Sequence, residues 1–253
     1  MTKKTLLCSA IALTILGAST IQAGDGHHAH WGYEGHAGPE HWGELSENFA
    51  TCSSGKQQSP IDIQSSAASN NLDNIVFNYQ SISPEVLNNG HTIQANYAAG
   101  SGIEVNGKHY DLLQFHFHTP SENTVDGKPY NMEMHLVHKS KDGQLAVVGV
   151  FMKQGDQNDV LQKLWDNMPQ KSGEKKQLQD VKLSALELLP TKRSYSHFAG
   201  SLTTPPCSEG VNWFVMDKPI ELSAAQIKKF ADTIGENARP TQPLNDRTIA
   251  KNM

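Results

Sequence analysis

The chain has 253 residues and a formal net charge of −5, which argues against a nucleic-acid-binding protein because such proteins need a basic surface. This length is enough for one domain with a sizeable core. No glycine–serine linker, internal repeat or long run of like charge divides the sequence, so a single domain is favoured.

The first 23 residues have the pattern of an export signal. Two lysines give a positive start, residues 6–17 form an apolar segment, and residues 21–23 end in the small residue alanine. The apolar segment is too short to span a bilayer comfortably, which argues against a retained anchor. We therefore expect a signal peptide at 1–23, one domain at 24–253, and a periplasmic or secreted protein with no stable membrane anchor. Loss of the two lysines and no acid leaves 19 basic against 26 acidic residues and a formal charge of −7.

Behind this signal, residues 27–30 form a histidine-rich tract. Such a tract could bind zinc, but a flexible, incidental tract is favoured because chain ends are poorly ordered unless they are tied down. The sequence leaves open both the cleavage site and metal binding by this tract.

Strand patterns dominate the middle of the chain. Segments rich in apolar, β-branched and aromatic residues lie at 91–97, 102–105, 109–118, 131–138, 146–153, 195–202 and 211–216. Asn106-Gly107 between two of these segments suits a tight hairpin. The middle segments are nearly continuous in apolar content, as expected of strands that are covered on both faces.

Helical spacing of apolar residues appears twice. The periodic residues are Val160, Leu161, Leu164, Met168, Ile227, Phe230, Ala231 and Ile234. Before the second group, Ser223 and Gln226 form a capping box, and Gly235 marks the end of that helix. The patterns alone predict a sheet with few helices.

Two of the strand segments carry histidines with the spacing of a metal site. His116 and His118 lie on one face of a strand, about 6.6 to 7 Å apart, and the phenylalanines between and before them lie on the other face. The second segment adds His135, with Glu133 on the same face. Three neutral nitrogen ligands with a free fourth position are typical of catalytic zinc.

A histidine pair in an alternating strand also arises by chance, so the neighbouring polar residues matter. Gln114 shares the face of the first two histidines, and Glu133 shares the face of the third. An amide or carboxylate so placed can accept the second imidazole N–H and free the other nitrogen for a metal. This favours a metal site.

Six motifs resemble those of the alpha-class carbonic anhydrases of the exported bacterial kind, and they occur in the order of that family. They are SPIDI (59–63), NNGH (88–91), QFHFHTPSEN (114–123), EMHLVH (133–138), SLTTPPC (201–207) and RPTQP (239–243). The resemblance covers nearly all of the mature chain. It implies a mainly β (α+β) fold, with a large, mostly antiparallel twisted central sheet, short peripheral helices and a Zn²⁺ ion at the foot of a cleft.

The resemblance also implies roles for individual residues. His116, His118 and His135 would bind zinc, supported by Gln114, Glu133 and Asn237. The catalytic residues would be Thr203 and Glu122, with His91 as proton shuttle. The carbon dioxide pocket would comprise Val137, Val147, Leu202, Val211 and Trp213, with Thr204 and Gln94 on the polar half of the cleft.

Thr203 has a physical reason for its role. A threonine hydroxyl has one proton to donate, and an ionised carboxylate can only accept. If Thr203 donates to Glu122, its oxygen must accept a hydrogen from the group on the zinc. This selects hydroxide or a deprotonated sulfonamide nitrogen. The alternative is an ordinary turn residue before two prolines.

The implied activity is that of a zinc lyase, which converts carbon dioxide reversibly to bicarbonate and a proton through zinc-bound hydroxide. Sulfonamide and anion inhibitors are expected. One alternative is a non-catalytic periplasmic zinc-binding protein of the same fold, although such a protein needs neither Thr203 nor Glu122. A metallohydrolase for larger substrates is disfavoured because no further acid or base accompanies the zinc. The sequence leaves the oligomeric state and the physiological direction of the reaction open.

Two cysteines remain after removal of the signal, Cys52 and Cys207. An exported chain enters an oxidising compartment, where two cysteines tend to form a disulfide. We therefore expect a Cys52–Cys207 bond. Two buried free thiols, the alternative, would suit a cytosolic protein better.

Overall fold

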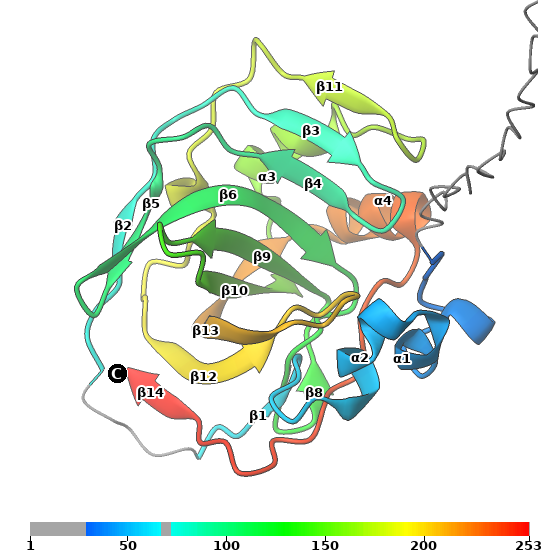
Figure 1. The fold of residues 1–253 in the computed structure, drawn as a ribbon. Coiled ribbons are helices and arrows are strands. Elements are labelled where there is room, and N and C mark those ends of the chain that lie inside the picture. Colours follow the sequence, from blue (N-terminus) through cyan, green and yellow to red (C-terminus); the bar gives the residue numbers. More distant parts are fainter. Residues whose placement is uncertain (1–28, 67–71, 253) are drawn as a thin grey trace, which may run out of the picture.

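A mixed sheet of eleven strands runs through the molecule (Figure 1). The structure is a computed structural model that describes residues 29–66 and 72–252, so the predicted signal peptide and most of the histidine-rich tract lie outside the described residues. Across the sheet the strands are β11 (Lys175–Gln177), β3 (Glu85–Asn88), β4 (Ile93–Asn96), β6 (Lys108–His118), β9 (Met132–Lys139), β10 (Leu145–Gln154), β13 (Glu209–Leu222), β12 (Tyr195–Ser201) and β14 (Ala250–Asn252). In addition, β5 (Gly102–Val105) pairs with β6 and with β2 (Val76–Asn78).

Almost every pair of neighbours in this sheet is antiparallel, and β10 with β13 is the parallel exception. A small second sheet joins β1 (Asp62–Ile63), β7 (Thr124–Val125) and β8 (Lys128–Pro129). The predicted fold class, a large and mostly antiparallel sheet with short peripheral helices, is confirmed. None of the helices in the described part of the chain is long and apolar enough to cross a membrane.

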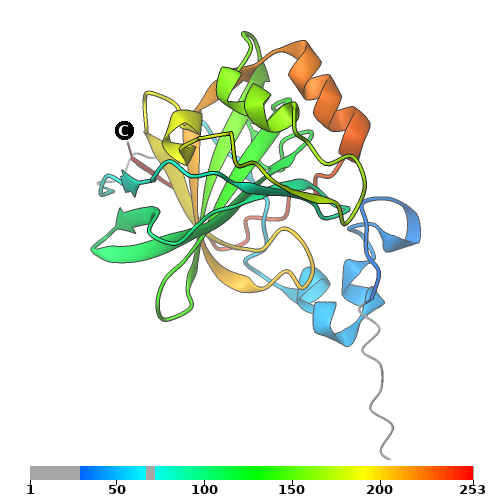
Figure 2. The ribbon, with the colours of Figure 1, turned by 90° about the horizontal axis from the view of Figure 1, so that it is seen from above.

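The central strands are covered on both faces, as their apolar content predicts. In β10, residues 146–152 are all buried. On one face, helices α3 (Asp159–Trp165) and α4 (Ala224–Ile234) pack against β6 (Figure 2). The ring of Phe117 lies 4.8 Å from that of Trp165 and 6.1 Å from that of Phe230. These contacts use the phenylalanine side of β6 and leave its histidine side facing the other way.

Some element boundaries differ from the predicted ones. The first helix ends at Trp165, so Met168 lies beyond it, although its side chain is buried. The second helix has the predicted Ser223–Gln226 capping box. Strand β13 extends well past 216, because its pairing with β10 resumes after an irregularity near that residue. A bulge of this kind interrupts the local pattern without ending the strand.

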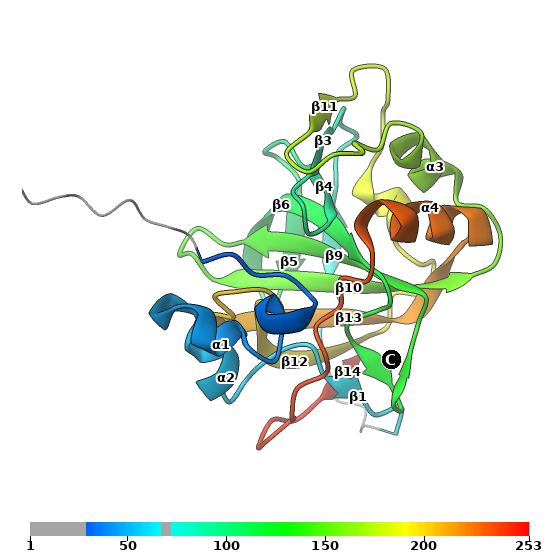
Figure 3. The ribbon, with the colours of Figure 1, turned by 90° about the vertical axis from the view of Figure 1, so that its right-hand side faces the viewer.

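The amino-terminal segment forms two short helices, α1 (Trp42–Leu45) and α2 (Thr51–Ser54), placed away from α3 and α4 (Figure 3). Within residues 29–66 and 72–252, the other helical segments are three 3-10 turns, at Gly35–Ala37, Glu47–Phe49 and Ala185–Leu188. The predicted disulfide is present between Cys52 in α2 and Cys207. Both cysteines are buried against Trp42. The bond ties this segment to the turn that carries Thr203.

Removal of the disulfide should destabilise the fold. The bond closes a loop with a sequence separation of 155 residues, and loop-closure entropy then gives up to about 5 kcal/mol of stabilisation. In the double variant Cys52→Ala, Cys207→Ala, we expect the free energy of unfolding, measured by urea titration, to fall by a large part of this amount. An unchanged urea midpoint with an unchanged slope would show that the bond contributes nothing.

A buried histidine on the α3 side of the sheet limits stability in acid. His138 is 0% exposed, accepts or shares the hydroxyl proton of Tyr79 at 2.8 Å, and contacts the main-chain oxygen of Ala146 at 3.3 Å. Burial lowers the pKa of His138 to about 3, from an ordinary value of 6.5. Between these two values the unfolded chain binds more protons than the folded one, so stability falls as the pH falls through this window.

We expect His138→Gln to flatten this pH dependence. Lowering the pH from about 7.5 to about 5 should lower the free energy of unfolding of the unsubstituted protein by about 2 kcal/mol more than that of the variant. The reason is that pH 5 lies about 1.5 units below the pKa of the histidine in the unfolded chain. Urea titrations of both proteins at the two pH values measure the difference, and other titrating groups cancel. Equal losses in the two proteins would mean that His138 does not set the acid limit.

Candidate active site

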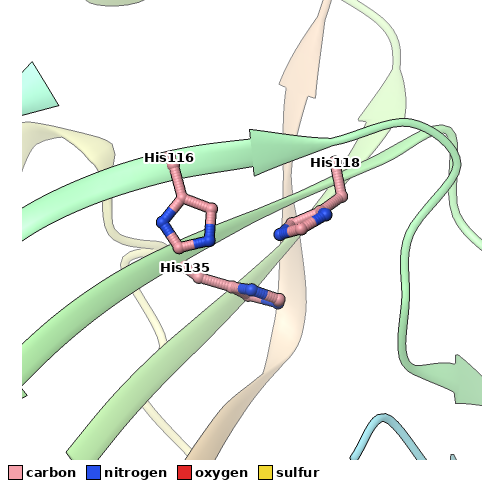
Figure 4. Close-up of side chains that lie close together, drawn as sticks. All are labelled: His116, His118 and His135. Atoms are coloured by element: carbon pink, nitrogen blue, oxygen red, sulfur yellow. The ribbon is translucent and has the colours of Figure 1, made fainter. Parts of the chain in front are cut away.

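Three histidines from β6 and β9 face one another on the side of the sheet away from α3 and α4 (Figure 4). Each offers a ring nitrogen, and these three atoms lie within 4.8 Å of one another. Strand pairing explains the convergence, since His116 lies opposite His135 and His118 follows on the same face. Within the described part of the chain, this is the only group of three metal-ligating side chains that meets this spacing. The structure thus brings the predicted ligands together.

An acceptor orients each of the first two histidines from behind. His116 Nδ1 lies 2.8 Å from Gln114 Oε1, and His118 Nδ1 lies 2.8 Å from the main-chain oxygen of Asn237. Because the nitrogen that donates carries the proton, Nε2 of each ring keeps its lone pair. His118 Nε2 is buried and has no hydrogen-bond partner among the described residues. Asn237 therefore supports a candidate ligand through its main chain.

Glu133 lies behind the third histidine. Its Oε1 is 3.2 Å from His135 Nε2, although the two are not aligned as a regular hydrogen bond, and Nδ1 is then the nitrogen available to the cluster. The carboxylate accepts two hydrogen bonds of 2.8 Å from Asn123, one from the main-chain N–H and one from the side-chain amide. Burial raises the pKa of Glu133 to about 7, and these hydrogen bonds oppose the rise.

This set of donors fits zinc. Burial is the main cause that lowers the pKa of all three imidazoles, to about 4 for His118 and well below the ordinary value for His116 and His135. The rings are therefore neutral near pH 7, which is the form that binds a metal. Three neutral nitrogens, each turned by an acceptor on its far side, match a catalytic zinc site with an open fourth position. A bound cation would also favour the charged form of Glu133.

Glu122 lies beside the histidine cluster and is almost fully buried. Its Oε2 is 3.5 Å from His118 Nε2. The main-chain N–H of Arg239 donates to Oε1 at 2.9 Å. Thr203 is close enough to lower the pKa of the carboxyl group, but Oε2 has no regular hydrogen-bond partner among the described residues. Burial raises the pKa of Glu122 to about 8, and Thr203 and the main-chain N–H of Arg239 oppose the rise. Thr203 therefore lies next to Glu122, and its hydrogen bond to this carboxylate stays a prediction.

A cleft of about 140 Å³ opens onto the histidines. The residues that line it include His116 and His118 together with His91, Gln94 and Thr204. The ring of His91 stacks on that of Trp31, with centroids 3.8 Å apart. Partial burial lowers the pKa of His91. The candidate shuttle thus shares a cleft with two candidate ligands.

An apolar cluster adjoins the third histidine. Its buried and partly buried members include the five predicted pocket residues, Val137, Val147, Leu202, Val211 and Trp213. Strand pairing aligns three of them in one row, because Val147 lies opposite Val137 on one side and Trp213 on the other. The Trp213 ring contacts His135 edge-on, with centroids 4.8 Å apart. The predicted pocket residues are therefore gathered beside the histidine cluster.

The sequence matches the family described as eukaryotic-type carbonic anhydrase over residues 37–253. The chain belongs to the alpha-class carbonic anhydrase family. A carbonic anhydrase of Nostoc sp. is 50% identical over 223 residues, which cover 87% of this chain and 84% of the relative. A carbonic anhydrase of Neisseria gonorrhoeae is 47% identical over 241 residues, which cover 94% of each chain.

Solved carbonic anhydrases share the fold. The alpha-carbonic anhydrase of Thermovibrio ammonificans, solved with the inhibitor sulfanilamide, matches with a TM-score of 0.85 at 47% identity, over 88% of this chain and 99% of that one. The likeness in sequence and structure covers most of the chain, so this protein is a carbonic anhydrase. The three-histidine cluster is consistent with the zinc dependence of the family.

Sequence reasoning missed the residues that hold the two buried carboxylates of this carbonic anhydrase. Asn123 binds Glu133 through two hydrogen bonds, and its place directly after Glu122 was the available signal. Arg239 binds Glu122 across 117 positions of sequence. No local pattern predicts that contact, because it depends on how distant segments pack.

Proposed function

We propose that this carbonic anhydrase converts carbon dioxide and water reversibly to bicarbonate and a proton, with zinc held by His116, His118 and His135. The observation that carries the proposal is the convergence of three neutral imidazole nitrogens within 4.8 Å, beside an apolar cluster and a buried threonine–glutamate pair. When bound, zinc supplies a Lewis acid that lowers the pKa of water to about 7, an effect for which carbonic anhydrase is itself the reference example.

The Thr203 hydroxyl orients the reacting oxygen. A bound zinc ion would favour the ionised form of Glu122. Thr203 then donates its one proton to Glu122, which as a carboxylate can only accept. The threonine oxygen then binds a group only if that group carries a hydrogen. This turns the lone pair of the attacking oxygen toward carbon dioxide, and orientation of this kind lowers the barrier without new chemistry.

The apolar cluster provides the place for carbon dioxide. The substrate is small and apolar, so it binds where water is excluded rather than where hydrogen bonds are offered. Val147 and Trp213 are 2% and 1% exposed, and they lie next to His135 on neighbouring strands. Thr204 and Gln94 line the cleft itself, where the charged product is released.

A zinc-binding protein without turnover is disfavoured by the buried pair. Such a protein needs ligands but gains nothing from burying Glu122, whose pKa is raised to about 8 by the loss of water. A buried carboxyl that costs stability is instead expected at a site where it has a chemical task. The Thr203 contact gives it that task.

We extend the proposal to inhibitors and to location. The Thermovibrio ammonificans relative was solved with sulfanilamide, and the proposed role of Thr203 as an acceptor suits a sulfonamide N–H, so aromatic sulfonamides and small anions should inhibit this enzyme. We place the protein in the periplasm or outside the cell, with residues 1–23 as its signal. The Cys52–Cys207 disulfide supports an oxidising compartment.

A stopped-flow assay of carbon dioxide hydration tests the function. Zinc-loaded protein should accelerate hydration far above the buffer rate, and sulfanilamide or prior removal of zinc with a chelator should abolish the acceleration. Hydration at the buffer rate by protein with one bound zinc per chain would reject the proposal.

We expect His91→Ala to slow proton release rather than carbon dioxide conversion. An imidazole has an ordinary pKa of about 6.5, which burial lowers in His91, so the neutral ring is available near pH 7 to take the proton and pass it to buffer. In weak buffer kcat should fall by up to about 100-fold, while kcat/KM stays nearly unchanged. Added imidazole should restore much of the lost kcat.

His109→Ala is the matched control. His109 also lies in β6, but it does not line the cleft, and its side chain is 51% exposed. It should behave as the unsubstituted enzyme in both buffers. A loss of kcat/KM in His91→Ala in proportion to kcat, or no response to imidazole, would assign His91 a structural role.

A further inference from the structure

The buried side chain of Arg239 connects several segments around Glu122. It is 2% exposed. Nη1 donates to Gln58 Oε1 at 2.9 Å and to the main-chain oxygen of Ser59 at 2.8 Å, and Nη2 donates to the main-chain oxygen of Cys52 at 2.8 Å. The main-chain N–H of the same residue donates to Glu122 Oε1. One residue therefore fixes both the 52–59 segment and the carboxylate.

Gln58 extends this connection to the turn that carries Thr203. Its amide Nε2 donates to the main-chain oxygen of Cys207 at 3.0 Å and to Glu209 Oε1 at 3.1 Å. The side chain of Gln58 is 3% exposed. The far end of the turn, four residues after Thr203, is thus held by the amide whose other atom binds Arg239.

The near end of the turn is held by the neighbouring residue. The main-chain N–H of Ser59 donates to Ser201 Oγ at 2.9 Å, and the main-chain N–H of Ser201 donates to Ser59 Oγ at 3.1 Å. Both serines are 0% exposed. The turn 201–207 is therefore attached at both ends to residues 58 and 59, and Arg239 binds both of these residues.

These contacts form a closed circuit. Hydrogen bonds and the chain itself lead from Thr203 along its turn to Cys207, across to Gln58 and Arg239, and then to Glu122, whose carboxylate lies beside Thr203. We propose that Arg239 and Gln58 are positioning residues that hold the Thr203 hydroxyl where it can donate to the Glu122 carboxylate. The inference rests on the proposed role of Thr203 in the reaction.

The position of this pair matters more than its strength. A hydroxyl that orients an attacking group works only in a narrow range of distance and angle, and a misplacement of about 1 Å can cost about 100-fold in rate. The disulfide fixes the same turn to α2, but it does not reach Glu122. The contacts of Arg239 with Gln58 and Ser59 link the turn to the residue whose main chain holds the carboxylate.

The test uses Arg239→Met and Gln58→Met in the zinc-loaded full chain, with kcat/KM, zinc content and melting temperature as measurements. We expect kcat/KM to fall about 10- to 100-fold with one zinc still bound per chain. Arg239→Lys, which keeps a charged donor, should lose less. Gln58→Met leaves the net charge unchanged, and it still provides the test if Arg239→Met does not fold.

A binding measurement separates positioning from general damage. With the proposed role of Thr203, sulfanilamide donates an N–H to its oxygen, whereas thiocyanate carries no hydrogen for it. We expect both variants to bind sulfanilamide about tenfold more weakly, the effect of one hydrogen bond, with thiocyanate binding unchanged. Arg247→Met is the control, because Arg247 also donates to main-chain oxygens, of Leu244, Ala199 and Pro243, but contacts neither Glu122 nor the turn in the described structure. It should retain both affinities.

Combination with Thr203→Ala decides the mechanism. If Arg239 and Gln58 act through Thr203, then Arg239→Met and Gln58→Met should lower kcat/KM hardly further in a chain that already carries Thr203→Ala. Full additivity, or equal weakening of sulfanilamide and thiocyanate, would overturn the positioning role while leaving the proposed function intact. If Thr203→Ala alone has no effect, the proposed role of Thr203 fails, and the positioning role fails with it.

Discussion

Replacing His118 with alanine is expected to abolish zinc binding and carbon dioxide hydration together. His118 is 1% exposed, and its Nε2 faces the other two imidazoles without another partner among the described residues. Alanine leaves two nitrogen ligands, and two hold zinc far less well than three because a catalytic site already leaves one position open. Zinc content after dialysis and the stopped-flow rate measure the two losses.

His109→Ala is again the appropriate control, because it removes a histidine from the same strand outside the cluster. It should retain one zinc per chain and full activity. The His118→Ala variant should also lose the thermal stabilisation that zinc provides in the unsubstituted chain, since a ligand that binds only the folded state stabilises it. Full zinc content in His118→Ala would show that the ligand set is wrong.

The histidine faces could be predicted because they depend on local geometry. Side chains alternate along any strand, so the spacing of His116 and His118 fixes a common face before the partner strand is known. That His135 lies opposite His116 is a matter of register between β6 and β9. The sequence indicates such a register only through the alternation of buried residues, and the resemblance to the family supplied the rest.

The parallel pairing of β10 with β13 could not be predicted in the same way. These strands are separated by α3, β11 and β12 in the chain, and their pairing is decided by how the whole sheet closes. The apolar pocket depends on it, because Val147 and Trp213 become neighbours only through this pair. Their periodic pattern alone indicates ordinary core residues.

The contacts around Glu122 could not be predicted from the sequence either. The RPTQP motif was visible in the sequence, but a motif does not say which atoms its arginine binds. Arg239 contacts Gln58 across 181 positions. Such contacts follow from packing of segments that are distant in the chain. The signal peptide, the single domain at 24–253 and the cellular location stay predictions.

Replacing Thr203 with alanine is expected to reduce kcat/KM by about 100-fold or more, with zinc retained. Thr203 is 6% exposed and is not one of the three candidate ligands, so its loss leaves the donor set intact. The variant loses the only hydroxyl that we assign to orienting the attacking oxygen, and removal of one positioned hydrogen-bonding group typically costs about 100- to 1,000-fold. Ser208→Ala, an exposed residue just beyond the same turn, should be neutral.

Glu122→Gln provides the second half of this prediction. A glutamine can donate as well as accept, so Thr203 no longer has a partner that forces its proton away from the zinc side, and kcat/KM should fall by a similar factor. Because the two residues act as one unit, the double variant should lose little more than either single variant. Losses that multiply in the double variant would show that Thr203 and Glu122 act independently, and the threonine would then be a turn residue whose effect on the rate has another origin.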